Sequence, residues 1–469
     1  MLRSPNIGRF STTLKVMRER AWVRLVSNRS RRLFLQIGLP WTAALLVGLM
    51  AVLYARWSED AYELFIGWIK GREYLAFAIT PLMTVIAVYC TRRWFSGSEG
   101  SGIPQVIAAL HAPSDQERTL MKRLFGLRVI FGKLGVSLLG FLGGLTIGRE
   151  GPTVHIGAAI MVETRRFYPH QTPRLERQLL LAGAAAGLSG AFNTPLAGII
   201  FAIEELARDF ESRTNGTMIT AVVFSGLTSL ALAGNYLYFG QINVPNNFHS
   251  EFVLPVILAA LLCGLMGAAF NWALLHWERW MPKPMRMWRG NKPLLYALIM
   301  GLLVAALGVA THGQTWGSGY DQARQLLAGN NPITQGYAVA KWAAMVVSYL
   351  SGLPGGLFSP SLSIGAGIAQ WVHLVFGWAP MASMIALCMT GYLAAVTQSP
   401  LTSFVIVMEM TNGTGLVIPM MATSLLAARL SGIFTPPLYE ALAEKNYFPL
   451  VPGYQPKAAH ARTTDDTLG

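Results

Sequence analysis

An arginine and a glutamate stand side by side in the stretch GREGPTVHIGA, residues 148–158, which joins two apolar segments. An ionised carboxylate near the middle of a membrane costs roughly 2.5–3.5 kcal/mol on insertion scales, so a glutamate in such a place is a candidate for function. Glu150 can bind and release a proton, and its place at a predicted helix start also favours negative charge. The predicted chemistry of Glu150 is therefore proton binding at a position that attracts anions.

Arg149 and His155, both near Glu150, could each have a structural role or a functional one. A salt bridge between Glu150 and its neighbour Arg149 would be weak, because adjacent residues of a helix point in different directions. We therefore expect Arg149 to have a structural and electrostatic role. His155, about one helical turn beyond Glu150, is either a packed polar residue or a proton relay.

Enzymatic chemistry is disfavoured by the motifs that the chain lacks. There is no HExxH and no GxSxG, and the GK pair at residues 132–133 has neither the spacing of a P-loop nor the following serine or threonine. Cys90, Cys263 and Cys388 lie in or beside apolar segments without paired spacing, so no disulfide framework or thiolate metal site is predicted. We expect no enzyme activity, no metal and no cofactor.

The elements that position Glu150 occur twice in the chain. GREGPTVHIGA at residues 148–158 aligns without a gap on GLFSPSLSIGA at residues 356–366. A second pair follows, LSGAFNTPLAGIIFAIEE at residues 188–205 and LAAVTQSPLTSFVIVMEM at residues 393–410. The spacing between the two blocks differs by three residues between the copies, which a loop can absorb. The sequence therefore predicts two related halves.

Acidic residues in the second pair of blocks fall into two groups. Glu204 aligns with Glu409 as Pro195 aligns with Pro400, and both glutamates are expected to cap or tie helix ends. Glu205 has no acidic counterpart in the second copy. An acid that the repeat does not share is the better candidate for a specialised task.

Three stretches that combine glycine with proline mark predicted helix starts. Pro152 and Pro360 suit the first turn of a helix, and GSGIP at residues 100–104 is a third start of this kind. A helix N-terminus offers free N–H groups and a partial positive charge, so it can bind an anion without a fixed cation that would hinder release. The alternative is that these residues only permit close helix packing. Three such starts, two of them within the repeat, favour an anion site.

The composition places these elements in a membrane. Charged residues make up only 13% of the 469 residues, against about 25% in soluble domains, and the mean hydropathy is +0.42. Charge-free stretches, such as those between Arg32 and Arg56 and between Lys292 and Asp321, can each hold a membrane helix of about 20 residues. Internal repeats with broken helices are typical of secondary transporters. We predict an all-α polytopic membrane protein with at least ten hydrophobic segments.

Basic residues gather at the ends of the apolar segments. The N-terminal tail, residues 1–32, carries nine basic residues and one acid, so the positive-inside rule predicts that it is cytoplasmic and close to anionic lipid. Basic clusters within residues 165–177 and 283–292 mark further cytoplasmic loops, whereas residues 235–250 carry no charge and are predicted to face outward. The net charge of +14 is therefore not interpreted as a nucleic-acid surface.

Four stretches together resemble the signatures of the CLC family of chloride channels and chloride/proton exchangers. They are GSGIP at residues 100–104, GREGP at 148–152, GLFSP at 356–360 and the tyrosine of PPLYEAL, Tyr439. They occur in the family's order, and the resemblance extends from about Leu33 to about Phe448. It implies a CLC-type fold with two inverted-topology repeats and a homodimer in which each subunit has its own anion pathway.

The resemblance also implies an anion-binding site. Similar proteins hold the central anion with the hydroxyls of the GSGIP serine and the late tyrosine, here Ser101 and Tyr439. Backbone N–H groups in GLFSP, here those of Leu357 and Phe358, complete the site. The serine argues for chloride, because nitrate-selective relatives carry proline there and the fluoride exporters depart from this signature.

Two glutamates take their roles from the same resemblance. Glu150 matches the gating glutamate, whose carboxylate takes the place of the anion when ionised and swings away when protonated. Glu205 matches the internal proton-transfer glutamate of exchangers. Lys133 and Arg149 match basic positions of the family, for which we expect structural and electrostatic roles.

One departure from the family pattern follows GSGIP. Gln105 and Ile107 lie in a segment where family members often carry acidic residues. These two residues are expected to change intracellular electrostatics or dimer contacts and to leave the anion ligands unaffected.

The predicted organisation has three parts. They are a basic cytoplasmic tail at residues 1–32, a transport domain at 33–448 with repeat halves at about 74–234 and 252–433, and a short tail at 449–469 without regulatory domains. This organisation suggests a compact prokaryotic member of the family. Its predicted location is the bacterial inner membrane.

The resemblance implies a secondary active transporter that exchanges chloride for protons. Its expected partners are chloride, protons, membrane lipid and a second copy of the chain. A passive chloride channel of the same fold remains an alternative, although Glu205 weighs against it, because passively conducting relatives tend to lack an acid there. A purely structural scaffold would not need broken helices with matched glycine and proline starts.

Overall fold

The fold is described from a computed structural model of the chain. The described residues are 34–111, 121–207, 216–234, 237–242, 252–330 and 333–450. The predicted N-terminal tail and nearly all of the predicted C-terminal tail lie outside these ranges, as does most of the loop at residues 235–250.

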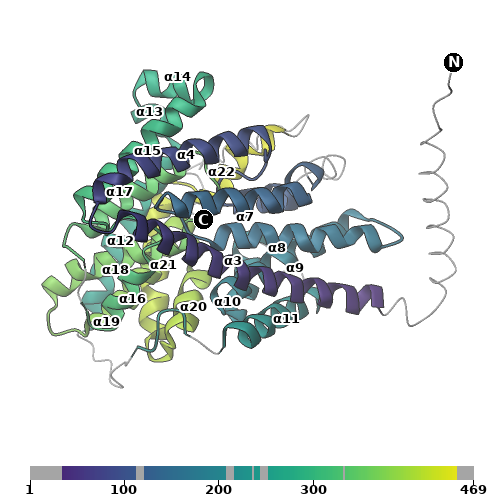
Figure 1. The fold of residues 1–469 in the computed structure, drawn as a ribbon. Coiled ribbons are helices and arrows are strands. Elements are labelled where there is room, and N and C mark those ends of the chain that lie inside the picture. Colours follow the sequence, from purple (N-terminus) through teal and green to yellow (C-terminus); the bar gives the residue numbers. More distant parts are fainter. Residues whose placement is uncertain are drawn as a thin grey trace, which may run out of the picture.

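Helices make up almost all of the described structure (Figure 1). The first group of α-helices runs α3 Leu39–Ile69, α4 Ala76–Arg93, α5 Ile103–His111, α7 Leu127–Leu142, α8 Glu150–Glu163, α9 Pro173–Phe192, α10 Pro195–Phe201 and α11 Gly216–Ala233. The second group runs α12 Val253–Leu275, α13 Trp277–Trp280, α14 Lys283–Asn291, α15 Pro293–Ala310, α16 Tyr320–Leu327, α17 Tyr337–Leu350, α18 Phe358–Val375, α19 Met381–Thr397, α20 Pro400–Thr411, α21 Val417–Phe434 and α22 Leu438–Asn446. Within the described ranges the chain forms two isolated β-bridges and no strand, so the all-α prediction is confirmed.

Seven helical segments are long and apolar enough to cross a membrane. They are Leu39–Ile69, Glu73–Arg93, Met121–Leu142, Gly216–Ala233, Val253–Leu275, Pro293–Ala310 and Thr414–Asn446. Three shorter apolar helices, α17, α19 and α20, bring the hydrophobic segments to the ten that the composition predicts. The chain is therefore a polytopic membrane protein.

The two halves pack their helices in the same pattern. Helix α8 packs on α9 as α18 packs on α19, and α11 packs on α9 as α21 packs on α19. Helix α3 packs on both α9 and α11, and α12 packs on both α19 and α21. In this pairing the counterpart of α12 is α3, which precedes the predicted start of the first half at residue 74.

The core of the molecule consists of α8, α9, α18 and α19. Almost every residue of α8 and α19 is buried, as are most of those on α9 and α18. Small residues make this packing possible. A side chain at Gly157 of α8 would overlap the backbone of Gly183 in α9, so these two helices approach closely only because both positions are glycine.

Both halves break a helix at corresponding places. Helix α9 ends at Asn193 with φ 56°, and α19 ends at Gln398 with φ 59°, so each helix stops at a left-handed residue. A new helix then starts at Pro195 in one half and at Pro400 in the other, where proline fits the first turn. The aligned prolines predicted from sequence therefore mark real helix starts.

Glu204 and Glu409 each cap the new helix start of the other half. The carboxylate of Glu204 accepts hydrogen bonds from the backbone N–H groups of Leu401 (3.0 Å) and Thr402 (2.6 Å) in α20. The carboxylate of Glu409 accepts them from Leu196 (3.1 Å) and Ala197 (2.7 Å) in α10. Each half thus caps a helix of the other, and α10 and α20 lie side by side in Figure 1. The predicted capping role of both glutamates is confirmed.

The remaining sequence features have structural places. The basic cluster at residues 283–292 forms α14, which projects with α13 from the helical body in Figure 1. The three cysteines are free thiols, and Cys263 Sγ donates to the carbonyl of Cys388 at 3.4 Å. This agrees with a packing role for Cys263 and Cys388.

Candidate functional site

Three helix starts meet at the centre of the molecule. Gly148 and Gly356 exchange two backbone hydrogen bonds of 2.8 and 2.7 Å, which join the turns before α8 and α18. Gly100 accepts a hydrogen bond from the N–H of Gly355 (3.1 Å) and donates one to the carbonyl of Leu353 (3.2 Å), which adds the turn before α5. GSGIP, GREGP and GLFSP are thereby brought together from positions far apart in the chain.

A buried lysine holds one of these turns. Lys133 of α7 is fully buried, and its Nζ donates to the carbonyls of Gly100 (2.7 Å) and Glu99 (3.2 Å). The carbonyls of this turn therefore face the lysine. A buried positive charge next to the GSGIP turn raises the electrostatic potential for an anion there.

The second half contains a related arrangement. Lys341 lies 208 residues after Lys133, the same spacing that separates Gly148 from Gly356. Its buried Nζ donates to the carbonyl of Gly317 at 2.8 Å, and also to the carbonyls of Thr315 and Trp316 at 2.9 and 3.3 Å. The turn that Lys341 holds reads GSGYDQ, against GSGIPQ at residues 100–105. This third pair of blocks extends the repeat.

The related turn of the second half differs in its electrostatics. Ser318 accepts a hydrogen bond from the N–H of Tyr320 at 3.3 Å, and Asp321 places an acid in the first turn of α16. These groups use the N–H groups and the partial charge that an anion would need. The turn of the second half therefore differs from the GSGIP turn in that an acid lies beside it and its serine already accepts one N–H group.

Ser101 and Tyr439 present buried hydroxyl groups at the GSGIP turn. Both residues are fully buried, and Tyr439 lies close enough to interact with Ser101, Glu150 and Glu205. Within the described ranges, neither hydroxyl oxygen has a partner that meets full hydrogen-bond geometry, although the two lie close enough for one to donate to the other. Buried hydroxyls without partners are rare because each loses its bonds to water. When one hydroxyl donates to the other, one O–H donor is still left for a ligand that accepts hydrogen bonds.

The start of α18 contributes backbone and aromatic groups to this place. Leu357 is the N-cap of α18 and Phe358 is its first residue, where N–H groups have no partner within the helix. The Phe358 ring stacks on Tyr439 with centroids 6.1 Å apart, and the rings of Phe192 and Phe201 meet it edge-on at 6.3 and 6.1 Å. The positions predicted as anion ligands are thus close together in an aromatic, water-poor setting.

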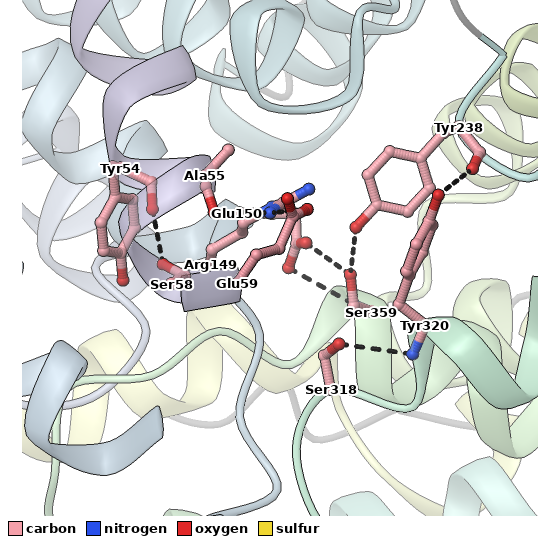
Figure 2. A network of polar contacts seen from close by, with 10 residues as sticks. All are labelled: Tyr54, Ala55, Ser58, Glu59, Arg149, Glu150, Tyr238, Ser318, Tyr320 and Ser359. Carbon is pink, nitrogen blue, oxygen red and sulfur yellow. Dashed lines mark hydrogen bonds and ion pairs between the residues drawn. The ribbon is translucent and has the colours of Figure 1, made fainter. Parts of the chain in front are cut away.

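The carboxylate of Glu150 lies at the same helix start. Ser359 Oγ donates to Glu150 Oε1, and the Ser359 N–H lies 3.4 Å from Oε2 (Figure 2). Glu150 is fully buried. The carboxylate therefore lies at the start of α18, where the helix dipole also favours an anion.

Arg149 turns away from Glu150 and pairs with a different acid. Its Nη1 lies 2.7 Å from Glu59 Oε1 and donates to the carbonyl of Ala55 at 3.0 Å, both on α3. Its guanidinium also lies over the Tyr238 ring, 5.6 Å from the centroid. A salt bridge between Arg149 and Glu150 does not form, as the sequence geometry predicted.

A cavity of about 460 Å³ leads to Glu150. It is bordered by α3, the start of α8, the segment around Tyr238 and the start of α16. The charged residues that line it are Arg56, Glu59, Glu63, Arg149, Glu150, Asp321 and Arg324. The cavity therefore presents residues of both charges next to Glu150.

Glu205 lies in a π-helical turn, Ala202–Ala207, at the end of α10. Its side chain is 1% exposed, and Ser399 Oγ, next to the start of α20, donates to its carboxylate. Glu205 also lies close enough to interact with Tyr439. Turns of this type are rare and often occur at functional sites. Glu205 thus lies on an element separate from that of Glu150.

Three further residues have structural places. His155 is buried, its Nε2 lies 2.8 Å from the carbonyl of Leu124 and its ring packs edge-on against Phe125 at 5.0 Å, which favours the packed interpretation. Gln105 is fully buried and donates to the carbonyl of Glu99 at 2.6 Å, and Ile107 is 3% exposed. The expectation of dimer contacts for Gln105 and Ile107 is therefore wrong, because both side chains are inside the subunit.

Several site residues were missed in the sequence. Ser359, Tyr238 and Glu59 surround the Glu150 and Arg149 pair, and Ser399 contacts Glu205. No local pattern predicts these contacts, since each joins residues far apart in the chain. Lys341 was also missed, although its spacing from Lys133 and the GSGYDQ turn were visible in the sequence.

The fold and the site define a polytopic membrane protein with two related halves that meet at paired broken helices. The family model described as "Voltage gated chloride channel" matches residues 83–432. The H(+)/Cl(-) exchange transporter ClcA of Klebsiella pneumoniae subsp. pneumoniae is 30% identical over 394 residues, which covers 79% of each chain. The chain therefore belongs to the voltage gated chloride channel family, the CLC family.

Solved structures of similar shape agree with this assignment. A slow cyanobacterial Cl⁻/H⁺ antiporter superposes with a TM-score of 0.71 at 23% identity, covering 87% of this chain and 97% of that one. A CLC-type fluoride/proton antiporter superposes with a TM-score of 0.72 at 20% identity, covering 86% and 96%. The predicted CLC-type fold with two inverted halves is confirmed.

Proposed function

We propose that the protein is a secondary active transporter that exchanges chloride for protons. The observation that carries this proposal is the pair of buried hydroxyls, Ser101 and Tyr439, beside the start of α18, where the carboxylate of Glu150 also lies. Such a place can hold one anion, and a carboxylate and a chloride would compete for it. Competition between a titratable group and an anion is the simplest way to link the two ions.

Chloride would bind where hydrogen-bond donors converge without a full countercharge. The donors would be the hydroxyls of Ser101 and Tyr439 and the backbone N–H groups of Leu357 and Phe358. Lys133 lies behind the GSGIP turn and would add attraction without touching the ion. A site of this kind binds the anion strongly enough for entry and weakly enough for release.

Glu150 would act as the gate. In its ionised form the carboxylate accepts hydrogen bonds from Ser359 at the start of α18 and so closes the route from the cavity. A proton removes its charge and therefore its attraction to the helix start. The neutral side chain would then leave, and an anion would take its place. Each opening would thus consume a proton from the cavity side.

Glu205 would receive or supply the proton on the opposite side. It is buried, it accepts a hydrogen bond from Ser399 and it lies close to Tyr439. Glu205 is not among the residues that line the cavity at Glu150. A second titratable station is what separates a coupled exchanger from a passive channel with a titratable gate.

The names of similar proteins support exchange. The relative from Klebsiella pneumoniae is named as an H(+)/Cl(-) exchange transporter, and two of the similar structures are described as antiporters. A passive chloride channel is the competing candidate, because the matched family model carries a channel description. We infer transport, not catalysis, as the activity.

The cellular setting is part of the proposal. The basic tail at residues 1–32 supports a cytoplasmic N-terminus by the positive-inside rule, and the bacterial relative supports an inner-membrane location. The resemblance to the family supports a homodimer surrounded by lipid. Each subunit would have its own pathway, because the site is built within one chain.

Flux measurements in liposomes test this function. Purified protein is reconstituted with a chloride gradient, and a chloride electrode and a pH electrode record both ions together. We expect coupled movement for the natural protein, and chloride flux without coupled proton movement for Glu150→Gln, because glutamine keeps the shape and removes the titration. Chloride flux with no proton movement in the natural protein would favour the channel. Full coupling in Glu150→Gln would show that Glu150 is not the gate.

A further inference from the structure

Ser359 makes two contacts with the carboxylate of Glu150. Its hydroxyl donates to Oε1, and its backbone N–H lies 3.4 Å from Oε2 (Figure 2). Both residues are buried, Ser359 with 1% of its surface exposed and Glu150 with none. Because no water competes in this buried place, the hydrogen bond from the hydroxyl to the carboxylate is stronger than it would be at the surface.

Tyr238 orients the Ser359 hydroxyl. The two hydroxyl oxygens lie 3.4 Å apart, and either atom could be the donor by distance alone. A serine hydroxyl has one proton, and Ser359 gives it to Glu150, so the tyrosine must donate to Ser359 Oγ. The order of donation is therefore Tyr238 to Ser359 to Glu150.

Tyr238 is itself held in place from three sides. Its carbonyl accepts a hydrogen bond of 2.8 Å from the Tyr320 hydroxyl, and its ring packs edge-on against Tyr320 and Phe192 at 4.7 and 5.4 Å. The Arg149 guanidinium covers the ring. Figure 2 shows Tyr238 and Tyr320 on one side of Ser359 and Glu150 on the other. The phenol therefore approaches Ser359 from a fixed direction.

From these contacts we propose that Ser359, oriented by Tyr238, is a positioning residue that stabilises the ionised, closed state of Glu150 and thereby sets the pH at which the gate opens. This inference rests on the gating role proposed for Glu150. The proposed role belongs to the side chain of Ser359. The start of α18 contributes only backbone N–H groups to the proposed anion site. The hydroxyl acts through Glu150 and does not touch the anion.

The sign of the effect follows from the hydrogen bonds. A donor to a carboxylate favours the charged form, since a protonated carboxyl oxygen is a poorer acceptor. Ser359 already receives the proton of Tyr238 and gives its own to Glu150. The contact that keeps Glu150 at the helix start is therefore weaker when Glu150 is neutral. Removing the Ser359 hydroxyl should let Glu150 accept a proton at a higher pH.

Other charged and titratable groups also face Glu150. They are Tyr54 and Glu59 of α3, the neighbour Arg149, Tyr238, Tyr439 and, around the cavity, Arg56, Glu63, Asp321 and Arg324. Outside the apolar helices, burial raises the pKa of the Asp321 carboxyl, nearby Glu59 raises it further, and Arg324 lowers it. Asp321 is thus a further group in this cavity whose charge could change in acid, and the experiment must separate it from Glu150.

The test measures chloride flux from liposomes as a function of pH on the cavity side. We expect Ser359→Ala to move the midpoint of acid activation to higher pH by about one unit, because a hydrogen bond to a charged group has roughly this effect. Ser359→Thr keeps the hydroxyl and should restore the natural midpoint. Tyr238→Phe should shift it in the same direction by a smaller amount. The shift should persist in an Asp321→Asn background.

A matched control lies two residues further along α18. Ser361 is also fully buried, and its hydroxyl has no hydrogen-bond partner in the described part of the chain. Ser361→Ala removes the same atom from the same helix and should leave the midpoint unchanged. A similar shift in Ser361→Ala would mean that any small cavity in α18 has this effect, which would overturn the inference.

A Glu150→Gln background separates the two levels of the proposal. If Glu150→Gln retains full proton coupling, the proposed function is wrong. If Glu150→Gln loses coupling but Ser359→Ala and Tyr238→Phe keep the natural midpoint, the gate is right and the positioning role is wrong. A Ser359→Ala shift that persists undiminished in the Glu150→Gln background also overturns the inference, because the serine would then act elsewhere.

Discussion

At the scale of single residues, a small number of buried polar groups carries the account. Ser101 and Tyr439 have hydroxyls that need an acceptor, and Glu150 and Glu205 have carboxylates that each accept a serine hydroxyl from the second half. The first pair suits an anion and the second pair suits a proton. Their closeness around Tyr439 is what makes coupling between the two ions physically reasonable.

The two adjacent glutamates at the end of α10 should behave differently. Glu205→Gln removes a titratable group and should abolish coupled proton movement while chloride flux remains. Glu204→Gln should keep the coupling, because Glu204 has a structural role: its carboxylate accepts hydrogen bonds from backbone N–H groups at the start of α20. Paired chloride and pH electrodes on liposomes distinguish them. Loss of coupling in Glu204→Gln with normal coupling in Glu205→Gln would reverse the assignment.

At the scale of elements, the two halves are joined by exchanged contacts. Glu204 caps α20 and Glu409 caps α10, so each half completes a helix of the other. The turns before α8 and α18 exchange backbone hydrogen bonds in the same way. These contacts fix the relative position of the halves, and the site lies between them. Stability of the interface and geometry of the site are therefore linked.

Removing one exchanged cap should destabilise the protein. Glu409→Ala leaves the N–H groups of Leu196 and Ala197 without their acceptor, and the loss of a helix cap costs about 1–2 kcal/mol. We expect a lower thermal unfolding temperature in detergent. Asp60→Ala is the control, because Asp60 is an exposed acid of α3 and should have little effect. Equal unfolding temperatures for Glu409→Ala and the natural protein would show that the caps do not hold the halves together.

At the scale of the whole molecule, the sequence predicts the frame better than the site. The helix starts can be predicted because glycine and proline restrict the backbone locally. The repeat can be detected because the blocks that begin at Gly148 and Gly356 align without a gap. The anion positions follow from the resemblance. Glu59, Tyr238 and Ser359 could not be predicted, because their roles depend on packing between distant segments and on the direction of single hydroxyls.

The central claim is that chloride and protons move in opposite directions as one coupled process. The most direct measurement clamps the voltage across liposomes that contain the natural protein and finds the voltage at which net proton movement stops. For a coupled exchanger this voltage should depend on the chloride gradient as well as on the proton gradient, and a chloride gradient alone should drive protons uphill. If protons stay at rest at every chloride gradient while chloride flows, the protein is a passive channel and the account is contradicted.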